Sequence, residues 1–486
     1  MRPARNLSVK VLGAFNWICD DTTAPVVMYS RGLAPGKGLG DLINGTNGTW
    51  LNNTVTVQKS ATTIGTSPAA AWWNNPIAAL TSNPGALTDL NSPSTIYYIN
   101  GNLTTYGLKI SAPKIAIVTI GAAMLSASDI DLNFAASECY SGSVSTSQMI
   151  CSGNQNHLWI EAGINGISGT YTLRTGVRLY GNKFSRIHRS NIKDLRNNSN
   201  TMAAVELETG STSNLITGLN ANGVGKQGGL RVSGSNNIIR GLFVARNRDV
   251  ASASQSLVVL TGSANGNRLI SARLAGLVAS GGTSYGLKIF GSNNAISDIS
   301  ISNIGSAGTN SGIYINGGGN NIITRSTISS TSNAGIEISG SSGNIITHVT
   351  TTLNNWNGLY MTGTVNNNLI HNFMSSWTDK SIQANTVSTT GTSNFFNNIV
   401  AASNGSGVAV DLASVGGSFN GFFDSGPGTT PSCSGGGFAG GACPGLTTDH
   451  STAFVGKVVS ADGINTSTLT DKFLAGLTET SSPVGI

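Results

Sequence analysis

The chain has 486 residues, of which 39% are hydrophobic, only 10% are charged and 63 are glycine. Its net charge of +6 is spread over single Arg and Lys residues, with no basic run of the kind that binds nucleic acid. No stretch of 18 consecutive apolar residues predicts a transmembrane helix.

Residues 1–94 are predicted to form a separate N-terminal β-rich segment and cap. Within it, "APVVMYSRG" and "TWLNNTVTVQK" are typical of strands. Trp72 and Trp73 are expected either to cover the end of the following core or to form a contact surface, because exposed aromatic side chains are costly. The N-terminus is basic, but Lys10 interrupts its apolar stretch, so no ordinary signal peptide is predicted.

Residues 95–173 are predicted to be irregular first coils of a repeat structure. They contain the β-rich runs "TIYYING", "GLKIS", "KIAIVTIG" and "HLWIEAG". Cys139 and Cys151 lie in a Ser/Gly-rich loop, and local pairs of this kind are typical of disulfides in an oxidising compartment. Cys19 has no evident partner.

Residues 174–424 are predicted to be a regular repeat. In each unit an asparagine is followed two residues later by a large apolar residue, and the asparagines lie about 26 residues apart on average. Side chains that stack at the strand spacing of about 4.8 Å can form a hydrogen-bonded ladder. The predicted ladder comprises Asn182, Asn214, Asn237, Asn267, Asn294, Asn321, Asn344, Asn368, Asn394 and Asn420.

Each repeat is predicted to contain three short strands. A strand with period-two alternation precedes the asparagine, as in Gly312-Ile313-Tyr314-Ile315. After the asparagine, the apolar positions change from even to odd spacing, which places a bend three or four residues beyond it. The sequence therefore predicts an all-β protein, a parallel β-solenoid of about ten regular coils that bury a shared core.

At these residues the sequence resembles a known family. The pattern in "SGIYINGGGNNIITRSTIS" resembles the right-handed parallel β-helix repeat of the pectate-lyase-like superfamily, over about half of the chain. That superfamily includes polysaccharide lyases, glycosidases, epimerases, phage tailspikes, adhesins and structural fibres, so the resemblance implies a fold rather than one function. The aspartate trio of polygalacturonases and the W-x-D-H motif of pectate lyases are missing from the sequence, and no metal or cofactor is predicted.

Residues 425–486 are predicted to be a C-terminal tail or cap. Its glycine-rich loop contains Cys433 and Cys443, which are predicted to form a second disulfide. The segment is expected either to close the end of the solenoid or to pair with another subunit.

Three sets of outward residues are candidates for function. Along the first strands, Tyr314 and Tyr360 offer flat faces to sugar rings, Glu337 offers a hydrogen-bond acceptor, and Trp356 lies in the preceding loop. The alternative is that this column only makes cross-strand contacts, and its predicted members are Arg178, Glu206, Arg231, Val258, Lys288, Tyr314, Glu337, Tyr360, Gln383 and Ala409.

Two weaker sets are candidates for catalysis. Asp298, Arg325 and His348 are expected on successive coils at the bend, where they can act in general acid–base chemistry or form a surface ion pair. Glu206 and Glu208 are predicted to point outward from one strand, roughly 6.6 Å apart. That separation falls within the range of about 6.5–9.5 Å for inverting glycosidases.

The sequence favours an extracellular or cell-surface protein of bacterial origin with a structural or adhesive role. Its low charge, its regular repeat and the lack of a complete catalytic set indicate a subunit that associates with itself, in an oligomer or a filament, and that binds polysaccharide. The alternatives are a polysaccharide lyase or glycoside hydrolase, and a phage-type tailspike that binds surface glycans.

Overall fold

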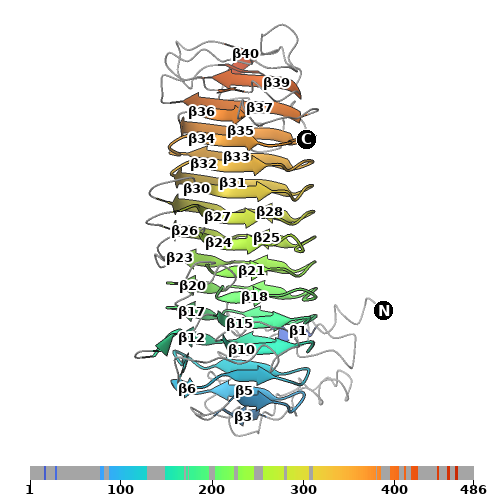
Figure 1. Ribbon diagram of the computed structural model, residues 1–486, viewed down its shortest axis with the longest axis vertical. Helices are drawn as coiled ribbons and strands as arrows, with labels where there is room; N and C mark the ends of the chain where they lie inside the picture. The colour runs from blue at the N-terminus through green and yellow to red at the C-terminus, as the bar shows by residue number, and fades with distance from the viewer. Residues whose placement is uncertain are drawn as a thin grey trace, which may run out of the picture. The chain divides into compact units, whose positions relative to one another are not determined.

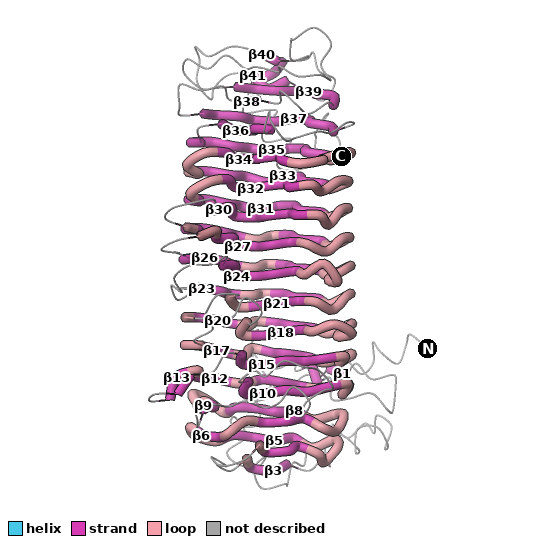
Figure 2. Tube along the Cα trace, viewed as in Figure 1, coloured by secondary structure: helices cyan, strands magenta, loops and turns pink. Residues whose placement is uncertain are grey.

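The computed structural model describes most of the chain between residues 87 and 378. The long described ranges are 87–127, 148–168, 175–195, 203–223, 228–245, 255–277, 282–305 and 310–378. Shorter segments are 16–17, 28–29, 77–80, 171–172, 380–384, 394–403, 410–411, 417–424, 446–447, 457–459 and 466–468. Within these residues every regular element is a strand (Figure 2), and no helix is long and apolar enough to cross a membrane.

The chain divides into two compact units. The first unit comprises Met1–Asn197, Met202–Gly225 and Asn237–Leu242, and the second comprises Asn198–Thr201, Lys226–Asn236 and Phe243–Ile486. In each unit, strands that are one coil apart in sequence lie side by side as parallel neighbours (Figure 1). Each unit therefore shows the stacking predicted for a parallel β-solenoid.

In the first unit three parallel sheets run from coil to coil. The first-strand sheet contains β4 (Thr88–Leu90), β7 (Leu108–Ile110), β10 (Gln148–Gly153), β15 (Thr175–Tyr180) and β18 (Val205–Leu207). The next contains β3 (Ile77–Ala79), β5 (Ile96–Ile99), β8 (Ala116–Thr119), β11 (Trp159–Glu161), β16 (Arg186–His188), β19 (Leu215–Thr217) and β22 (Ile238–Arg240). The last contains β6 (Leu103–Thr105), β9 (Leu125–Ala127), β12 (Gly163–Asn165), β17 (Asn191–Lys193) and β20 (Asn220–Asn222).

The second unit repeats this plan. Its first-strand sheet contains β21 (Leu230–Val232), β24 (Gln255–Leu260), β27 (Ser284–Ile289), β30 (Asn310–Asn316), β32 (Ala334–Ser339), β34 (Asn357–Thr362), β36 (Lys380–Ala384) and β38 (Val410–Asp411). Its other strands before the bend are β25 (Arg268–Ile270) and β28 (Ala295–Ser297), and those after it are β23 (Phe243–Ala245), β26 (Arg273–Leu277) and β29 (Ser300–Ile304).

From β31 onward the strands before and after the bend are continuous. These longer strands are β31 (Ile322–Thr331), β33 (Ile345–Thr352), β35 (Leu369–Thr378), β37 (Asn394–Ser403) and β39 (Gly417–Asp424), followed by β40 (Leu446–Thr447). Antiparallel pairs are β1 (Asn16–Trp17) with β2 (Met28–Tyr29), β13 (Ile167–Ser168) with β14 (Tyr171–Thr172), and β41 (Lys457–Val459) with β42 (Thr466–Thr468).

The core is built from the apolar residue two positions after each asparagine. Ile296, Ile323 and Ile346 are at most 1% exposed and lie in register on neighbouring coils. The glycine before the first core residue of several first strands is required by close approach. A Cβ on Gly312 would lie 2.7 Å from the carbonyl oxygen of Gly335 on the next coil.

The asparagines form hydrogen-bonded files. In the second unit, the Oδ1 atom of Asn321 accepts from the backbone N (3.0 Å) and from the Nδ2 (3.2 Å) of Asn294. The same pair of bonds joins Asn214 to Asn237 in the first unit. In the second unit it recurs for Asn267 with Asn294, Asn321 with Asn344, Asn344 with Asn368, and Asn368 with Asn394.

The bend lies four residues after the asparagine. The residues at this position have a positive φ, in the left-handed region, which turns the chain there. They are Gly218, Gly241, Ser271, Asp298, Arg325, His348 and Asn372. This confirms the bend predicted from the change in spacing of the apolar residues.

Two asparagines were assigned to the wrong position in the repeat. The side chain of Asn214 accepts from the backbone N of Ser185, so Ser185, not Asn182, occupies the ladder position, and Phe184 is 57% exposed. Near the other end, Asn420 pairs in register with Asn397, whereas Asn394 pairs with Gly417. Both errors arose because the ladder position of these coils holds Ser185 or Gly417, while an asparagine followed two residues later by Phe lies three residues away.

A similar slip affected the first-strand column. Val259, not Val258, lies between Arg231 and Lys288. The error arose because the run Leu257–Leu260 is apolar throughout, so its pattern does not show which residues point outward. Gln383 pairs with Asp411 rather than with Ala409. The remaining pairs of the column have the predicted register within each unit.

Most cysteine and cap predictions lie outside the described residues. Cys151 in β10 takes part in a disulfide. Its predicted partner Cys139, the predicted pair Cys433 and Cys443, and Trp72 and Trp73 lie outside the described ranges, so the pairings and the caps stay predictions. The predicted domain boundaries also stay predictions.

Candidate functional site

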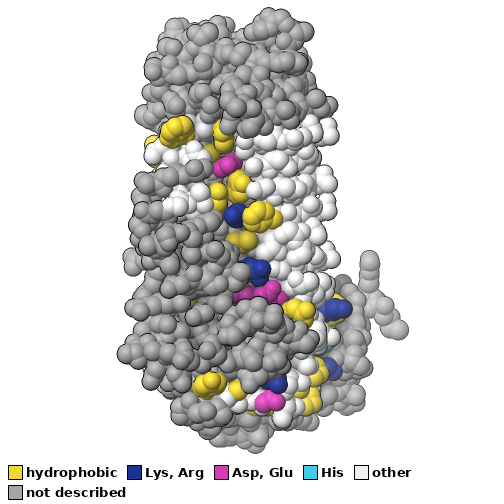
Figure 3. Space-filling model, in the orientation of Figure 1, with side chains coloured by type: hydrophobic (Ala, Val, Ile, Leu, Met, Phe, Trp, Pro, Cys, Tyr) yellow, Lys and Arg dark blue, Asp and Glu magenta, His cyan; other side chains and the backbone are white. Residues whose placement is uncertain are grey.

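A line of aromatic and charged side chains follows the first-strand sheet of the second unit. Its members lie on β27, β30, β32 and β34, and we call them the aromatic strip: Tyr285, Lys288, Tyr314, Glu337 and Tyr360. Lys288 pairs in register with Tyr314, Tyr314 with Glu337, and Glu337 with Tyr360. Hydrophobic, basic and acidic side chains follow one another along one face of the molecule in Figure 3.

Aromatic rings surround the ammonium group of Lys288. Tyr285 and Tyr314 stack with ring centroids 4.6 Å apart and planes at 17°. The Nζ of Lys288 lies 4.9 Å from the Tyr285 ring, 5.6 Å from the Tyr314 ring and 4.8 Å from the Phe290 ring. A cation over aromatic faces at such distances is attracted by their quadrupoles, so these rings fix the position of the ammonium group.

The acidic member of the strip is Glu337, which is 6% exposed. Its Oε2 atom accepts a hydrogen bond of 2.7 Å from the Ser311 hydroxyl. Burial raises the pKa of the Glu337 carboxyl above its ordinary 4.5, against the opposing effects of Ser311 and Lys288. Burial likewise lowers the pKa of Lys288 and raises that of Tyr285 to about 12. An acid and a base are thus shifted towards each other's range.

The structure places the predicted sugar-binding residues as follows. Tyr314, Glu337 and Tyr360 occupy successive coils, and the two tyrosines are half-buried. Trp356 lies in the turn before β34 and is 61% exposed. The sequence interpretation named Lys288 only as a member of the column and missed Tyr285, whose position three residues before Lys288 was the available signal.

The residues predicted at the bend form two separate contacts. Arg325 donates from Nε (2.9 Å) and Nη2 (3.0 Å) to the two carboxylate oxygens of Asp298 on an exposed surface. This hydrogen bonding by Arg325 lowers the pKa of Asp298. The Nε2 of His348 lies 2.9 Å from the Nδ2 of Asn372. The rings of His348 and His371 meet edge to face, with centroids 6.1 Å apart. Burial lowers the pKa of His371, and so does the neighbouring His348.

The predicted glutamate pair is held by an arginine. Glu206 is fully buried and Glu208 is 8% exposed, although both were expected to be open to solvent. Arg178 lies between them, with its Nε 3.3 Å from Glu206 and its Nη2 2.6 Å from Glu208. Thr175 and the backbone N of Ala203 also donate to Glu206. The guanidinium occupies the space that a catalytic water needs between two carboxylates, which argues against the glycosidase pair.

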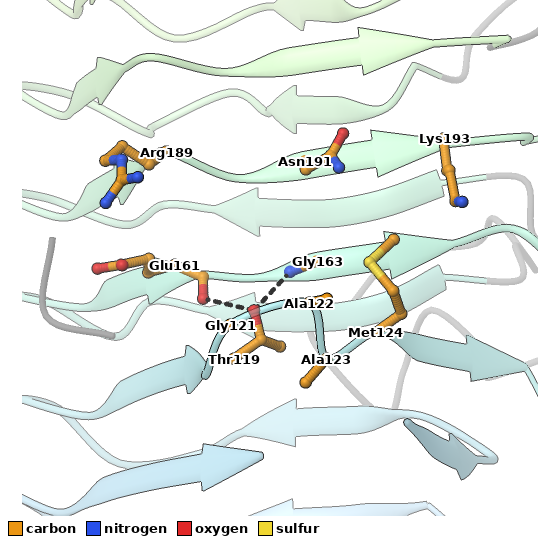
Figure 4. Close-up of a pocket in the computed structure, with 10 residues that line it drawn as sticks. All are labelled: Thr119, Gly121, Ala122, Ala123, Met124, Glu161, Gly163, Arg189, Asn191 and Lys193. Atoms are coloured by element: carbon orange, nitrogen blue, oxygen red, sulfur yellow. Dashed lines mark hydrogen bonds between the residues drawn. The ribbon is translucent and has the colours of Figure 1, made fainter. Parts of the chain in front are cut away.

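The first unit contains a pocket that sequence reasoning did not find. Its volume is about 340 Å³, and it lies beside the bend, where β11 and β12 meet β16 and β17 (Figure 4). The charged side chains that line it are Glu161, Arg189 and Lys193. The signal in the sequence was weak: Trp159 and Glu161 alternate with apolar residues in "HLWIEAG", as they do in many strands.

Glu161 in this pocket is fixed by its neighbours. It is 6% exposed, and its Oε2 accepts from the indole Nε1 of Trp159 at 3.2 Å. The guanidinium of Arg186 lies 5.0 Å from the Trp159 ring, and the His188 ring is tilted against it at 5.3 Å. Among the described residues, no group of three or more His, Cys, Asp or Glu is arranged to hold a metal ion.

Comparison with known proteins agrees with the stacking seen in the structure. Residues 285–438 match the family model described as "Right handed beta helix region". Together with the parallel stacking of the described strands, this match confirms the resemblance to right-handed parallel β-helix repeats predicted from the sequence. No curated protein matches the chain by sequence.

Solved structures that resemble the chain do so at low sequence identity and with TM-scores below 0.5. The Dettilon tailspike protein is 15% identical, with a TM-score of 0.44 over 78% of this chain and 71% of its own. The A-module of a mannuronan C-5 epimerase from Azotobacter vinelandii is 12% identical, with a TM-score of 0.41 over 69% of this chain and 90% of its own. An alginate lyase from Paenibacillus sp. is 13% identical, with a TM-score of 0.33 over 67% of this chain and 99% of its own.

Proposed function

We propose that this chain is an extracellular β-helix that binds polysaccharide along the aromatic strip, in an adhesive or structural role. The observation that carries the proposal is the stacked pair Tyr285–Tyr314 beside Lys288, with the hydrogen-bonded Glu337 on the next coil. Sugar rings pack their apolar faces on aromatic side chains, and their hydroxyls need fixed polar partners. The strip supplies both at a spacing of one coil, about 4.8 Å.

The arrangement also favours an extended ligand. Tyr314 and Tyr360 are both half-buried and lie two coils apart, with Glu337 between them in register. A glycan that lies along the stacking direction meets an aromatic side chain, a carboxyl group and a second aromatic side chain in turn. Trp356 extends this surface from the loop before β34.

Binding of polysaccharides to the full chain, measured by affinity electrophoresis and then by titration calorimetry, tests this proposal. Replacing Tyr314 or Tyr360 with Ala is expected to weaken binding about tenfold, equivalent to about 1.4 kcal/mol. Tyr97→Ala provides the control, because Tyr97 is a half-buried strand tyrosine in the first unit. Unchanged affinity in both strip variants would exclude the strip as the glycan surface.

A second candidate function is cleavage of the bound polysaccharide. The pKa of Glu337 is raised and that of Lys288 is lowered, which is how an acid and a base are prepared for proton transfer. Glu337→Gln should then abolish product formation while binding persists. Elimination leaves a carbon–carbon double bond that absorbs ultraviolet light, whereas hydrolysis leaves only a new reducing end. No product from any bound glycan would remove this candidate.

The structural role includes self-association. Parallel strands at the ends of a solenoid are templates for pairing with another chain. Light scattering coupled to size-exclusion chromatography separates the options: a filament supports a fibre subunit, a trimer favours the tailspike alternative, and a monomer that binds glycan limits the role to binding.

A further inference from the structure

The pocket of the first unit has the size of a site for a small ligand. Its volume of about 340 Å³ lies at the small end of the range of about 300–1,000 Å³ for ligand pockets. It is lined from successive coils by the end of β8 and the loop Gly121–Met124, by β11 and β12, and by Arg189 and β17. None of these residues belongs to the aromatic strip, so the pocket is a separate site.

The polar groups are arranged along the length of the pocket. In the close-up, Glu161 and Arg189 lie at one end, Lys193 and Met124 lie at the other, and Asn191 lies between them (Figure 4). Asn191 and Lys193 are two residues apart on β17, so they face the same side at a spacing of about 6.6 Å. A ligand in the pocket meets an acceptor, an amide and an ammonium in line.

The geometry of the acidic end is fixed before any ligand binds. The indole of Trp159 holds the Glu161 carboxylate at 3.2 Å, and Thr119 accepts from the backbone N of Gly163 at 2.9 Å, which ties the pocket floor to the next coil. A Cβ on Gly163 would lie 2.6 Å from the backbone carbonyl oxygen of Ala123, so only glycine leaves this floor undistorted. Preorganised groups of this kind lower the entropic cost of binding.

The charge of the lining selects the ligand. Arg189 and Lys193 carry two positive charges and Glu161 carries one negative charge, which leaves an excess of one positive charge. The neighbouring Arg186, stacked on Trp159, adds to the positive potential. A ligand with one negative charge neutralises this excess, and its hydroxyl groups can donate to Glu161.

We propose that this pocket is a second carbohydrate site, which binds a sugar unit bearing a carboxylate. The carboxylate lies on the Lys193 ammonium, and the ring hydroxyls contact Asn191, Arg189 and Glu161. The site is independent of the aromatic strip, because every residue that lines it belongs to the first unit.

Titration calorimetry on the full chain tests the site, with a disaccharide of two hexuronic acids and the neutral dihexose of the same linkage as probes. The acidic probe is expected to bind at least tenfold more tightly, and this preference should weaken as salt is raised. Lys193→Gln should lower the affinity for the acidic probe about tenfold and leave the neutral probe unchanged. Lys183→Gln is the matched control, because Lys183 is exposed and does not line the pocket.

Two further variants locate the binding. Ala122→Trp fills the pocket from an exposed lining position and should abolish binding of the acidic probe without changing the melting temperature. Tyr314→Ala in the aromatic strip should leave it intact, so the two carbohydrate proposals fail separately. Equal affinity for both probes, no binding of the acidic probe, or full affinity in Lys193→Gln would overturn the proposal.

Discussion

Charged residues contact one another in the first-strand sheet of the first unit but are separated in that of the second. In the first unit, Arg178 on β15 contacts Glu206 on β18 and Glu208 just beyond it, and Thr175 completes the hydrogen bonds. In the second unit, Lys288 and Glu337 lie two coils apart, with Tyr314 in register between them. Equivalent strands therefore carry a closed ion network in one place and a separated base and acid in the other.

Whether charged residues on neighbouring coils contact one another decides whether they stabilise the fold or are available for function. An ion network that is desolvated and fully paired holds the coils together, because removing one member leaves a buried charge without compensation. A base and an acid separated by an aromatic ring keep the shift in pKa that burial imposes. Groups of the second kind are common at binding and catalytic sites.

The largest expected effect breaks the ion network. Arg178→Met leaves Glu206 and Glu208 buried without their cation, and the free energy of unfolding should fall by roughly 3–5 kcal/mol. Urea denaturation followed by circular dichroism measures the change. The triple variant that also carries Glu206→Gln and Glu208→Gln should recover much of the loss, and no loss in the single variant would contradict the buried network.

A smaller effect is expected for one rung of the asparagine file. Asn321→Ala removes the acceptor for Asn294 and the donor to Gly291, so buried groups lose their partners. The cost is expected to be about 1–3 kcal/mol in the same assay. Asn182→Ala tests the assignment of the ladder, because Ser185 occupies the ladder position of that coil. It should leave the backbone N of Ser185 bonded to the Oδ1 of Asn214, so a loss of exchange protection at the Ser185 amide in that variant would count against the assignment.

The next prediction concerns pH. The folded-state pKa of Glu337 is raised above 4.5, so its contribution to stability is full below that pH and is lost as pH rises through the folded value. Glu337→Gln removes this loss, and the variant should gain stability relative to wild type as pH rises from 4 to 7. Thermal unfolding across this range is the measurement.

Asp298 provides a control of opposite sign. Its folded-state pKa is lowered by Arg325, so its contribution is present above its ordinary 3.8 and is lost as pH falls through the folded value. Asp298→Asn should therefore be less stable than wild type at neutral pH, and this difference in unfolding free energy should shrink as pH falls. If the difference between Glu337→Gln and wild type does not change with pH, the buried carboxyl is wrongly described.

The smallest effect is expected at the exposed bend. Arg325→Asn breaks the ion pair with Asp298, which is worth about 0–1 kcal/mol at a surface. Asparagine adopts positive φ more readily than arginine does, so it offsets part of that loss. The unfolding free energy should change by less than about 1 kcal/mol, and a larger loss would show that the column does more than hold an ion pair.

The column of the aromatic strip could be predicted from the sequence, whereas the pocket of the first unit could not. The column Lys288, Tyr314, Glu337 and Tyr360 was predictable because a regular repeat sets which residues are neighbours on the stacked coils. The pocket around Glu161 was not, because it lies in the irregular coils, where no repeat relates Glu161 to Arg189 or to the loop at Gly121.

The errors of phase have a common physical cause. Alternation identifies a strand but gives no register when both parities are apolar, as in Leu257–Leu260. The asparagine motif likewise gives the wrong register where the ladder position holds another residue, as at Ser185 and Gly417. Register is then decided by which alignment satisfies the hydrogen bonds of the adjacent coils. Ser185 takes the ladder position on this basis, since its hydroxyl accepts from Leu158 and its backbone N donates to Asn214.

The sequence by itself determined the repeat, the strand order within a coil, the asparagine files and the position of the bend, because each depends on residues close together in the chain. Only the tertiary structure decided that Arg178 contacts Glu208 as well as its predicted neighbour Glu206, and that all three side chains are buried. Arg178 lies 28 residues before Glu206 and 30 before Glu208, and stacking of coils with unequal length brings them to within 3.3 Å or less. Coil length sets that register, and burial then separates a closed ion network from a base and an acid with shifted pKa values.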